Sequence, residues 1–301
     1  MSFPSRLWAA VERKGTPAMI GVDPRPAKFP EPFRARAVGR GAAGAAAAMR
    51  DYHRALLDVL APRVPAVKPN AAFFEELGPD GFGALADCVA HARALGLIVV
   101  MDAKRGDIGS TAEAYASTFL AGGYEGAFPA ADALTVNPYL GSDAVAPFLE
   151  AARAHDAGLF VLVKTSNPGA DEFQGHGTPP LAQRVAAAVA QWGAALVDSS
   201  GWSSVGAVVG ATRPEELAVF RALMPRAPLL LPGFGFQGGE ARGLAPAFDA
   251  LGRGAVVNAS RSVLWAHERA DLQHLPGWEA RVDAAVQEMV DALRPVARAV
   301  R

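Results

Sequence analysis

The sequence predicts a closed (β/α)8 TIM barrel that forms a single domain over residues 1–301. Eight short apolar segments alternate with alanine-rich amphipathic segments, which is the pattern of parallel strands joined by helices. The net charge is −1 and 51% of the residues are hydrophobic, which suits one large core. An open, doubly wound sheet is the alternative, because the same alternation of strands and helices builds it.

The expected strands are aliphatic and β-branched, as strands buried on both faces of a parallel sheet must be. In chain order they are 19–22, 66–68, 97–102, 133–136, 159–163, 207–210, 229–231 and 255–258. Amphipathic helices are expected between them at 50–60, 82–95, 143–154, 181–192 and 214–223. The last of these has a clear start signal, with Thr212 as the cap, then Pro214, and Glu215 three residues after the cap.

Several segments fall outside this repeat. Residues 24–41, rich in Pro, Arg and Phe, predict an extended loop or a short extra helix at the barrel mouth. Residues 165–180 are too rich in Gly and Pro for a regular element and predict either a mobile lid or a plain surface loop. The Gly-Ala run at 41–48 predicts a helix start, because alanine is the strongest helix former.

At the far end of the chain, apolar residues at helical spacing predict a helix at about 282–300 on the outside of the barrel. Pro295 should kink or end this helix, since proline lacks the backbone N–H that a helix interior needs.

Composition argues against several classes of protein. The absence of a basic block argues against a nucleic-acid partner, and no apolar run is long enough to cross a bilayer. The first residues lack the pattern of a secretory signal, so we expect a cytoplasmic protein. The lone Cys88 cannot form an internal disulfide and is expected to be buried. The six histidines are scattered, so the sequence predicts no metal site.

The segment 97–116, LIVVMDAKRGDIGSTAEAYA, carries a buried strand into a cluster of charges. Asp102 and Lys104 are two residues apart, so an extended backbone sends both side chains to one face. The turn that follows is expected to bring Asp107 back, so that two carboxylates bracket one ammonium. Ser110, with Glu113 three residues later, is expected to cap the next helix.

An exposed ion pair at a strand end, worth about 0.2–1 kcal/mol, is the plain alternative for this cluster. The strand before it is wholly apolar, and the charges stand at its carboxyl end. Because α/β proteins bind ligands at the carboxyl ends of parallel strands, a functional site is favoured.

In a barrel the carboxyl ends of all the strands meet at one mouth, and here these ends are polar. The residues at the ends of strands one, two, four and five are Asp23, Lys68, Asn137 and Lys164, the last followed by Thr165 and Ser166. The loops after strands seven and eight commonly hold a phosphate in such barrels. Glycines at 233, 235, 238 and 239 would let backbone N–H groups approach an anion, and Arg261 would add a bidentate cation.

These charges suggest a chemistry. An anchored phosphate would leave the reacting end of the substrate against Lys68, Asp102, Lys104 and Asp107. We find no serine elbow, no Cys-His pair and no carboxylate set free of lysine that would favour a divalent metal. A lysine between carboxylates keeps its proton, so it is a donor. An aspartate facing a substrate carboxylate, with a lysine that protonates the resulting carbanion, predicts a metal-free decarboxylase.

The motifs DAKRGDIGSTAEAYA, GVDPR, KPNAAFFEELG, PGFGFQGG and NASRS resemble the orotidine 5′-phosphate decarboxylase family, in its longer bacterial-type branch. The resemblance covers nearly the whole chain. It implies a barrel that dimerises across its mouth as a homodimer with shared active sites. It further implies conversion of orotidine monophosphate to uridine monophosphate in pyrimidine nucleotide synthesis, without a cofactor.

The resemblance also implies roles for the charged residues. Lys104 would protonate C6, and Asp102 would lie beside the leaving carboxylate. Asp23 and Lys68 would contact ribose hydroxyls and extend the charge network. Asp107 and Thr111 would be contributed to the site of the partner subunit.

For the rest of the substrate, Ser166 would contact the pyrimidine. Gln237 and Arg261 would hold the phosphate. The loop 232–239, which opens with Pro232 and Gly233, would bind substrate as a lid, with a possible contribution from 165–180. Asn70, Asn137, Lys164 and Arg213 either join the site or only cap helices and stabilise strand ends. Arg25 either reaches the ligand or faces water.

Three rival functions stay open. A metal-dependent phosphosugar decarboxylase would share the Asp-x-Lys-x-x-Asp core but needs further metal ligands. A Schiff-base aldolase would use Lys104 or Lys164 as the nucleophile and needs a lysine that readily loses its proton. A catalytically silent barrel would bind a nucleotide phosphate without turnover.

Overall fold

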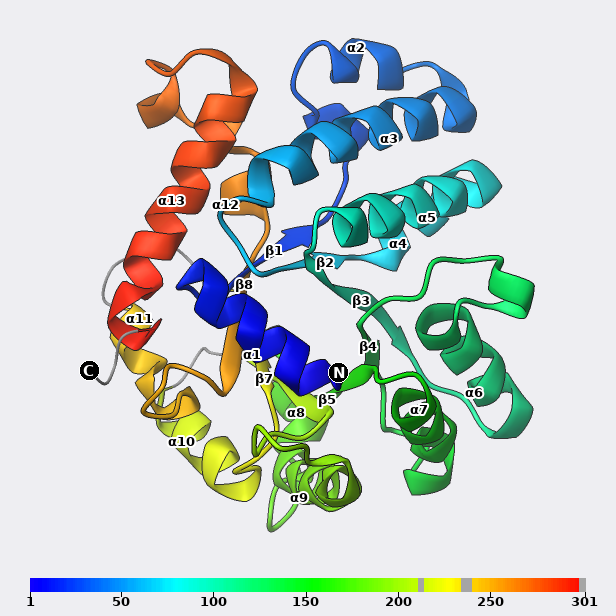
Figure 1. Cartoon of the computed structure of the whole chain (residues 1–301), viewed down its shortest axis with the longest axis vertical. Helices are drawn as coiled ribbons and strands as arrows, with labels where there is room; N and C mark the ends of the chain where they lie inside the picture. The colour runs from blue at the N-terminus through cyan, green and yellow to red at the C-terminus, as the bar shows by residue number, and fades with distance from the viewer. Residues whose placement is uncertain (211–213, 234–239, 298–301) are drawn as a thin grey trace.

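The computed structural model describes residues 1–210, 214–233 and 240–297, and in them eight parallel strands close into a barrel in chain order (Figure 1). The strands are β1 (Ala18–Val22), β2 (Ala66–Pro69), β3 (Ile98–Arg105), β4 (Ala133–Val136), β5 (Gly158–Lys164), β6 (Val205–Val209), β7 (Leu229–Leu231) and β8 (Ala255–Ala259). The barrel closes through the parallel pairing of β1 with β8, in which Met19 is opposite Asn258. The predicted (β/α)8 fold is therefore confirmed, and the open doubly wound sheet is wrong.

Helices surround the barrel. The longer ones are α1 (Phe3–Lys14), α3 (Gly41–Leu60), α5 (Gly78–Ala94), α6 (Gly109–Ala116), α7 (Ser142–Ala154), α9 (Leu181–Gly193), α10 (Pro214–Leu223) and α13 (Gly277–Ala297). The short ones are α2 (Phe33–Ala37), α4 (Ala71–Glu75), α8 (Ala170–Gln174), α11 (Glu240–Gly243) and α12 (Arg261–Leu264). Single turns of 3-10 helix lie at Pro26–Lys28, Tyr124–Gly126, Ala194–Leu196, Ala245–Ala247, Ala266–Glu268 and Ala270–Leu272, and a π turn at Ser117–Ala121.

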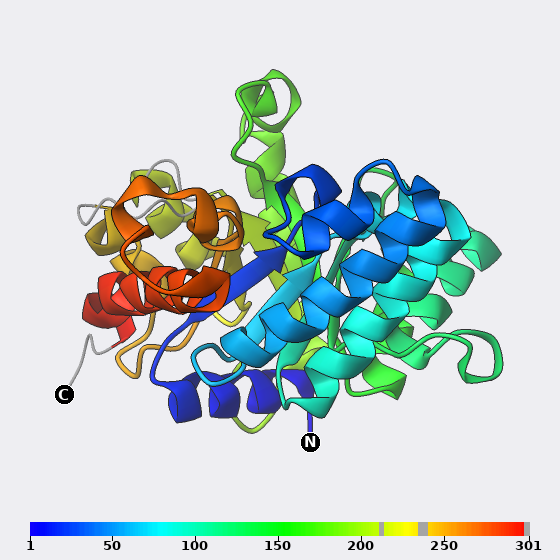
Figure 2. The ribbon, with the colours of Figure 1, turned by 90° about the horizontal axis from the view of Figure 1, so that it is seen from above.

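Helix α1, which the strand-helix repeat does not predict, covers the amino-terminal end of the barrel. In Figure 2 it lies below the strands, opposite the projecting segment that contains α8. Its Phe3 ring meets Phe160 of β5 edge to face, with the ring centroids 6.0 Å apart. A Cβ on Gly158 would lie 2.2 Å from the Phe3 ring, so only glycine fits there. This end of the barrel is therefore closed by apolar packing.

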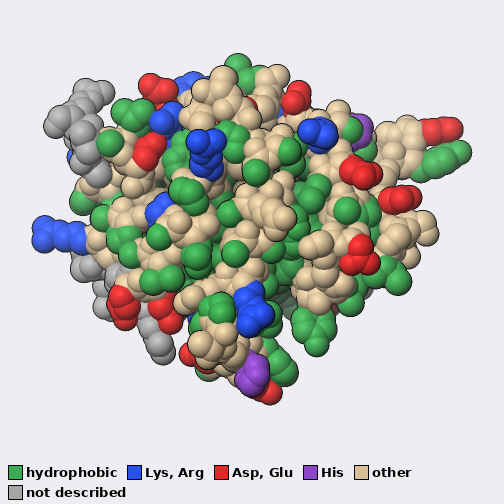
Figure 3. Space-filling view, turned by 90° about the horizontal axis from the view of Figure 1, so that it is seen from below, with side chains coloured by type: hydrophobic (Ala, Val, Ile, Leu, Met, Phe, Trp, Pro, Cys, Tyr) green, Lys and Arg blue, Asp and Glu red, His purple; other side chains and the backbone are tan. Residues whose placement is uncertain are grey.

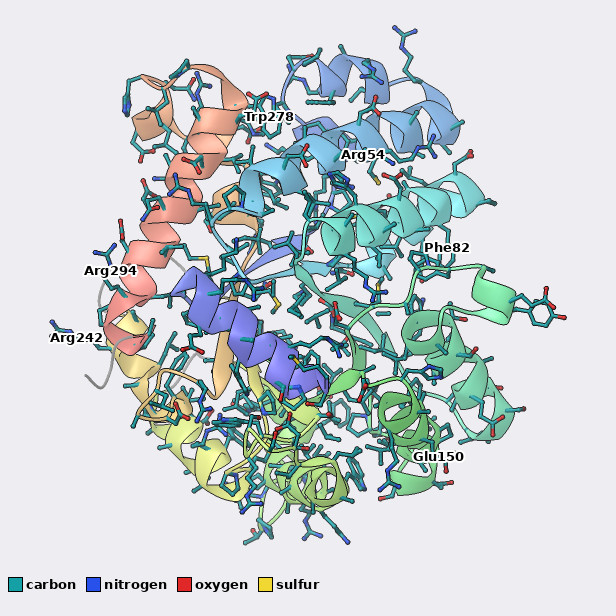
Figure 4. All side chains as sticks on the ribbon, viewed as in Figure 1. Arg54, Phe82, Glu150, Arg242, Trp278 and Arg294 are labelled. Atoms are coloured by element: carbon teal, nitrogen blue, oxygen red, sulfur yellow. The ribbon has the colours of Figure 1, made fainter. Side chains whose placement is uncertain are left out.

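The larger part of the core lies between the barrel and its outer helices. An aromatic group at the α3–α13 side joins Tyr52, Phe33 and Trp278, and Figure 4 labels Trp278 at the start of α13. His53 is buried in the same layer, against Phe74 and Phe29. Burial lowers the pKa of His53 to about 3, so the ring is neutral at ordinary pH.

The segments outside the repeat are mostly as predicted. Residues 24–41 hold a 3-10 turn and α2, the short extra helix expected there, and the Gly-Ala run begins α3. The expectation that 165–180 lacks regular structure is wrong, because α8 forms within it. The Gln174 side chain stabilises this helix by accepting the Thr165 backbone N–H at 2.9 Å and donating to its hydroxyl at 2.8 Å.

The helix predicted at 282–300 starts earlier, at Gly277, and its described part ends at Ala297. Pro295 does not end the helix, which continues to Ala297, although a proline at this position cannot donate a hydrogen bond to the carbonyl of Asp291. Helix α10 begins at Pro214 as predicted, while the Thr212 cap lies outside the described residues.

The described helices and the surface charges agree with what the composition predicts. Among the described helices none is long and apolar enough to span a membrane. On the face seen in Figure 3, side chains of both charges are scattered without a basic block.

Candidate active site

The centre of the site is Asp102 of β3, held between two lysines. The Lys68 ammonium of β2 bonds to its Oδ2, and the Lys104 ammonium to its Oδ1 at 2.5 Å. The side chains of Lys68 and Asp102 are each 7% exposed, whereas that of Lys104 is 49% exposed. Lys104 is therefore the member of this triad that can meet a ligand entering the mouth, and the reading of the cluster as a wholly exposed surface pair is wrong.

The ionisation of Asp102 follows from these contacts. Burial alone would raise the pKa of this carboxyl, but the charges and hydrogen bonds of Lys68 and Lys104 outweigh burial and lower the pKa to about 2. The carboxylate is therefore charged at ordinary pH. It presents a fixed negative charge beside an ammonium that faces the mouth.

The backbone of Lys104 has a conformation that non-glycine residues rarely adopt, with φ at 48°. It lies where the pairing of β3 with β4 shifts register between Met101 and Arg105. The Asp102 and Lys104 side chains still share one face, but a bulge and not a regular extended strand puts them there.

The expected bracketing of one ammonium by two carboxylates is wrong within this chain, because one carboxylate lies between two ammoniums. Asp107 turns to its own backbone, where its Oδ1 accepts the Ile108 N–H at 2.8 Å. No described cation forms an ion pair with Asp107. Ser110 is not the cap either, since α6 begins at Gly109 and no side chain caps it. The Asp107 bond to Ile108 takes up the backbone N–H just before the helix.

On the other side of the mouth, β1 and β8 approach closely. A Cβ on Gly21 would lie 2.0 Å from the Ser260 hydroxyl oxygen, so a larger residue would fit there only if Ser260 moved. This contact brings Asp23 after β1 and Arg261 at the start of α12 to the same side of the mouth. The Oδ1 atom of Asp23 is buried and accepts no hydrogen bond within the described residues. Arg261 is exposed and forms no described ion pair.

The loops after β5 and β7 also meet. A Cβ on Gly233 would lie 3.8 Å from the Ser166 hydroxyl oxygen, so these two predicted substrate contacts are neighbours. Ser166 is exposed, and Pro232 directly follows β7. Thr111 is exposed on α6. Gln237 and the glycines at 235, 238 and 239 lie outside the described residues.

Of the residues that either join the site or only stabilise the fold, the described ones make structural contacts, and their part in substrate binding stays a prediction. Asn70 caps α4 by accepting the Ala72 N–H at 3.3 Å, and Asn137 accepts the Tyr139 N–H at 3.1 Å. Lys164 is buried and paired with Asp171 of α8. Arg25 stacks over Phe73, 5.3 Å from the ring centroid. Arg213 lies outside the described residues.

Two further groups bear on metals and nucleophiles. Within 1–210, 214–233 and 240–297, no three His, Cys, Asp or Glu side chains gather closely enough to hold a metal ion. Cys88 is buried as predicted, and burial raises its pKa to about 12. The thiol is therefore inert at ordinary pH.

Comparison with known proteins gives the family. The model of the orotidine 5′-phosphate decarboxylase / HUMPS family matches residues 46–272. The chain belongs to this family. The resemblance read from the motifs is thereby confirmed.

Individual members of the decarboxylase family are similar to this chain in sequence and in structure. An orotidine 5′-phosphate decarboxylase of Rhodopirellula baltica is 43% identical over 300 residues, covering 98% of this chain and 99% of the relative. One from Deinococcus radiodurans is 46% identical, covering 87% of this chain and 90% of the relative. The structure of Leishmania donovani OMP decarboxylase matches with a TM-score of 0.74 and 33% identity, covering 99% of each chain. A Streptomyces avermitilis structure matches with a TM-score of 0.79 and 37% identity, covering 99% of this chain and 96% of that one.

Proposed function

We propose that this chain decarboxylates orotidine 5′-monophosphate to uridine 5′-monophosphate in pyrimidine nucleotide synthesis, with Lys104 protonating C6. The observation that carries the proposal is the buried Asp102 carboxylate held between Lys68 and Lys104 at the barrel mouth. Relatives of nearly the same length bear the name of this carboxy-lyase.

In this proposal the triad promotes the loss of carbon dioxide. The Asp102 carboxylate would face the substrate carboxylate, and their repulsion is relieved as carbon dioxide departs. The Lys104 ammonium would stabilise the negative charge that develops on C6, because its positive charge is already in position before the reaction starts. The same ammonium then gives C6 its proton.

The remaining predicted contacts would hold the nucleotide around this centre. Arg261, with Gln237 and the loop that begins at Pro232 and Gly233, would bind the phosphate. Asp23 would accept a hydrogen bond from a ribose hydroxyl, which suits its buried and unpartnered Oδ1. Ser166 would contact the pyrimidine. Lys68 serves the charge network, since its ammonium is bonded to Asp102.

A homodimer would complete the site. Asp107 and Thr111 flank Ile108, which is 60% exposed, and the loop after β4, which approaches Gly106 at Asn137, exposes Tyr139 by 81% and Leu140 by 50%. A second copy packed on this rim would cover these side chains and receive Asp107 beside its own Lys104. The carboxylate that the sequence places next to Lys104 would then come from the partner subunit.

The proposed chemistry needs neither a metal nor an organic cofactor, because Lys104 supplies both the charge and the proton.

We also propose that the protein acts in the cytoplasm, which suits a chain whose one cysteine is buried and reduced.

The test is the spectrophotometric loss of orotidine 5′-monophosphate, measured with and without excess chelator. The proposal expects the same turnover in both. Binding of uridine 5′-monophosphate without turnover would identify a silent binding barrel, and activity lost with chelator would identify a metal-dependent enzyme. Borohydride trapping of a phosphosugar on Lys104 or Lys164 would identify an aldolase.

A further inference from the structure

We infer that Thr135 of β4 is a positioning residue, whose buried hydroxyl holds both the backbone of Lys104 and the carboxylate that orients the Lys104 ammonium. Nothing in the motifs of the charged cluster points to this residue, because it stands one strand away in an apolar segment. The inference rests on the proposed role of Lys104 as proton donor.

The need for such a residue arises from the bulge in β3. Its pairing with β4 is regular at Val100–Ala133 and Met101–Leu134, then resumes at Arg105 opposite Val136. β3 therefore uses more residues than β4 to cover the same stretch, and Thr135 lies opposite the excess. Lys104 belongs to that excess and has its φ at 48°. A strained conformation of this kind persists only where its surroundings hold it.

The Thr135 hydroxyl supplies that support through two bonds. It accepts the Lys104 backbone N–H at 2.9 Å, which a regular ladder would have paired with a carbonyl. It lies 3.1 Å from Asp102 Oδ1 and 3.4 Å from the Met101 carbonyl oxygen. A hydroxyl has a single proton, and the shorter, charge-assisted bond to Asp102 is the stronger of the two.

The Thr135 hydroxyl oxygen thus connects the main chain of Lys104 with the carboxylate that binds the Lys104 ammonium. Asp102 Oδ1 receives the Thr135 hydroxyl and the Lys104 ammonium, while the main chain of Lys104 bonds to the same hydroxyl. Thr135 is 1% exposed, so bulk water cannot take over these bonds. Loss of the hydroxyl would leave the Lys104 N–H unpaired and free the side chain to move from the position in which it delivers its proton.

Thr135→Val tests this inference, because valine keeps the β-branched shape and removes only the hydroxyl. We expect kcat to fall about 10- to 100-fold, the size of effect that a displacement of about 1 Å can produce, with KM changed less than about twofold. Thr135→Ser restores the hydroxyl and should recover kcat to within about threefold of the unmodified enzyme.

Thr16→Val is the matched control at the other end of the barrel. Thr16 is also 1% exposed, and its hydroxyl accepts the Ala18 backbone N–H at 3.3 Å. This variant loses a similar buried bond far from the mouth, so its kcat should be unchanged. If Thr135→Val does not fold, Thr135→Ala removes the same hydroxyl without adding a methyl group, and the same loss of kcat is expected.

An unchanged kcat in the folded Thr135 variant, or a Thr135→Ser enzyme as slow as Thr135→Val, would overturn the inference. An equal loss of kcat in Thr16→Val would also overturn it, since the effect would then be general destabilisation. Lys104→Ala, measured beside these variants, separates the role of Thr135 from that of Lys104. If Lys104→Ala is inactive while Thr135→Val is normal, only the role of Thr135 fails. If Lys104→Ala is active, the proposed proton donor itself is wrong.

Discussion

The two ends of the barrel differ in the side chains that fill them. At the amino end, α1 closes the barrel with Phe3 and Leu7, both fully buried, and with Trp8 packed on Trp202. At the carboxyl end, a buried Lys68–Asp102 pair and a half-exposed Lys104 stand where apolar side chains would be more stabilising. Burying a charge, or breaking a buried ion pair, costs stability. Each buried aromatic or leucine side chain instead stabilises the fold by about 1.5–3 kcal/mol.

This difference indicates where stability and function lie. At the amino end the buried Asp132 carboxylate pairs with Arg6 of α1 at 3.0 Å and accepts the Val99 backbone N–H, so the charge there ties α1 to the barrel. At the carboxyl end, buried charge and the strained backbone of Lys104 cost stability, and they place a charged surface at the mouth. In (β/α)8 enzymes catalytic residues stand at the carboxyl ends of the strands, and the proposed site of this chain lies at the same end. Substitutions at the two ends should therefore separate activity from stability.

Lys104→Ala should have the largest effect. It removes both the proton donor and the charge that stabilises the carbanion, so kcat should fall by about 10⁴-fold or more. The fold should survive, because the Lys104 side chain is 49% exposed. Orotidine 5′-monophosphate turnover and thermal unfolding, measured on the same sample, check both statements. A lost fold would mean that the charged triad also holds the barrel together.

Phe3→Ala should have the opposite outcome. Removing this fully buried ring should lower the free energy of unfolding by about 3–5 kcal/mol, because the ring leaves a cavity against Phe160 and Gly158. kcat at a temperature where the variant is folded should be unchanged. Urea unfolding and turnover at low temperature provide the measurement. A loss of kcat in the folded variant would show that the two ends are coupled.

Arg261→Ala should weaken phosphate binding. The loss of charge-assisted bonds should raise KM about 10- to 100-fold with a smaller change in kcat. Arg153→Ala is the matched control, since Arg153 is an exposed arginine on α7 at the opposite end of the barrel. Its KM should be that of the unmodified enzyme. Equal KM values for the two variants would remove Arg261 from the phosphate site.

The pH dependence of stability should show the smallest effect. The pKa of Asp102 in the folded protein is about 2, below its ordinary value of 3.8. The carboxylate therefore stabilises the fold above about pH 4, and this contribution of about 2 kcal/mol is lost as the pH falls toward 2. The difference in unfolding free energy between the unmodified protein and Asp102→Asn should shrink by that amount between about pH 5 and pH 2. A difference that stays constant in urea titrations would contradict the shift.

The sequence predicts the barrel well because each strand is a short apolar segment bounded by polar residues. The charged triad is also partly predictable, since Asp102, Lys104 and Lys68 end neighbouring strands. Helix α1 is missed because it stands outside the strand-helix repeat, and its contacts with Phe160 and Trp202 are far away in sequence.

The finer geometry of the site follows from the bulge, which no pattern in the sequence marks. The sequence predicts that the turn after β3 brings Asp107 back to Lys104, whereas in the structure Asp107 accepts the backbone N–H of Ile108. Ser110 fails as a cap because α6 already starts at Gly109, which puts Ser110 inside the helix. Thr135 is overlooked because one hydroxyl in an apolar strand fits an ordinary β-branched residue.

The claim that an ammonium at position 104 gives C6 its proton can be tested most directly by chemical rescue. Lys104→Cys should be inactive, and alkylation of the new thiol with 2-bromoethylamine should rebuild an ammonium and restore turnover by orders of magnitude. The reagent should select this position, since Cys88 is buried with its pKa raised to about 12. Alkylation with neutral iodoacetamide should restore nothing. Turnover by Lys104→Cys before alkylation, or equal recovery with iodoacetamide, would contradict the account.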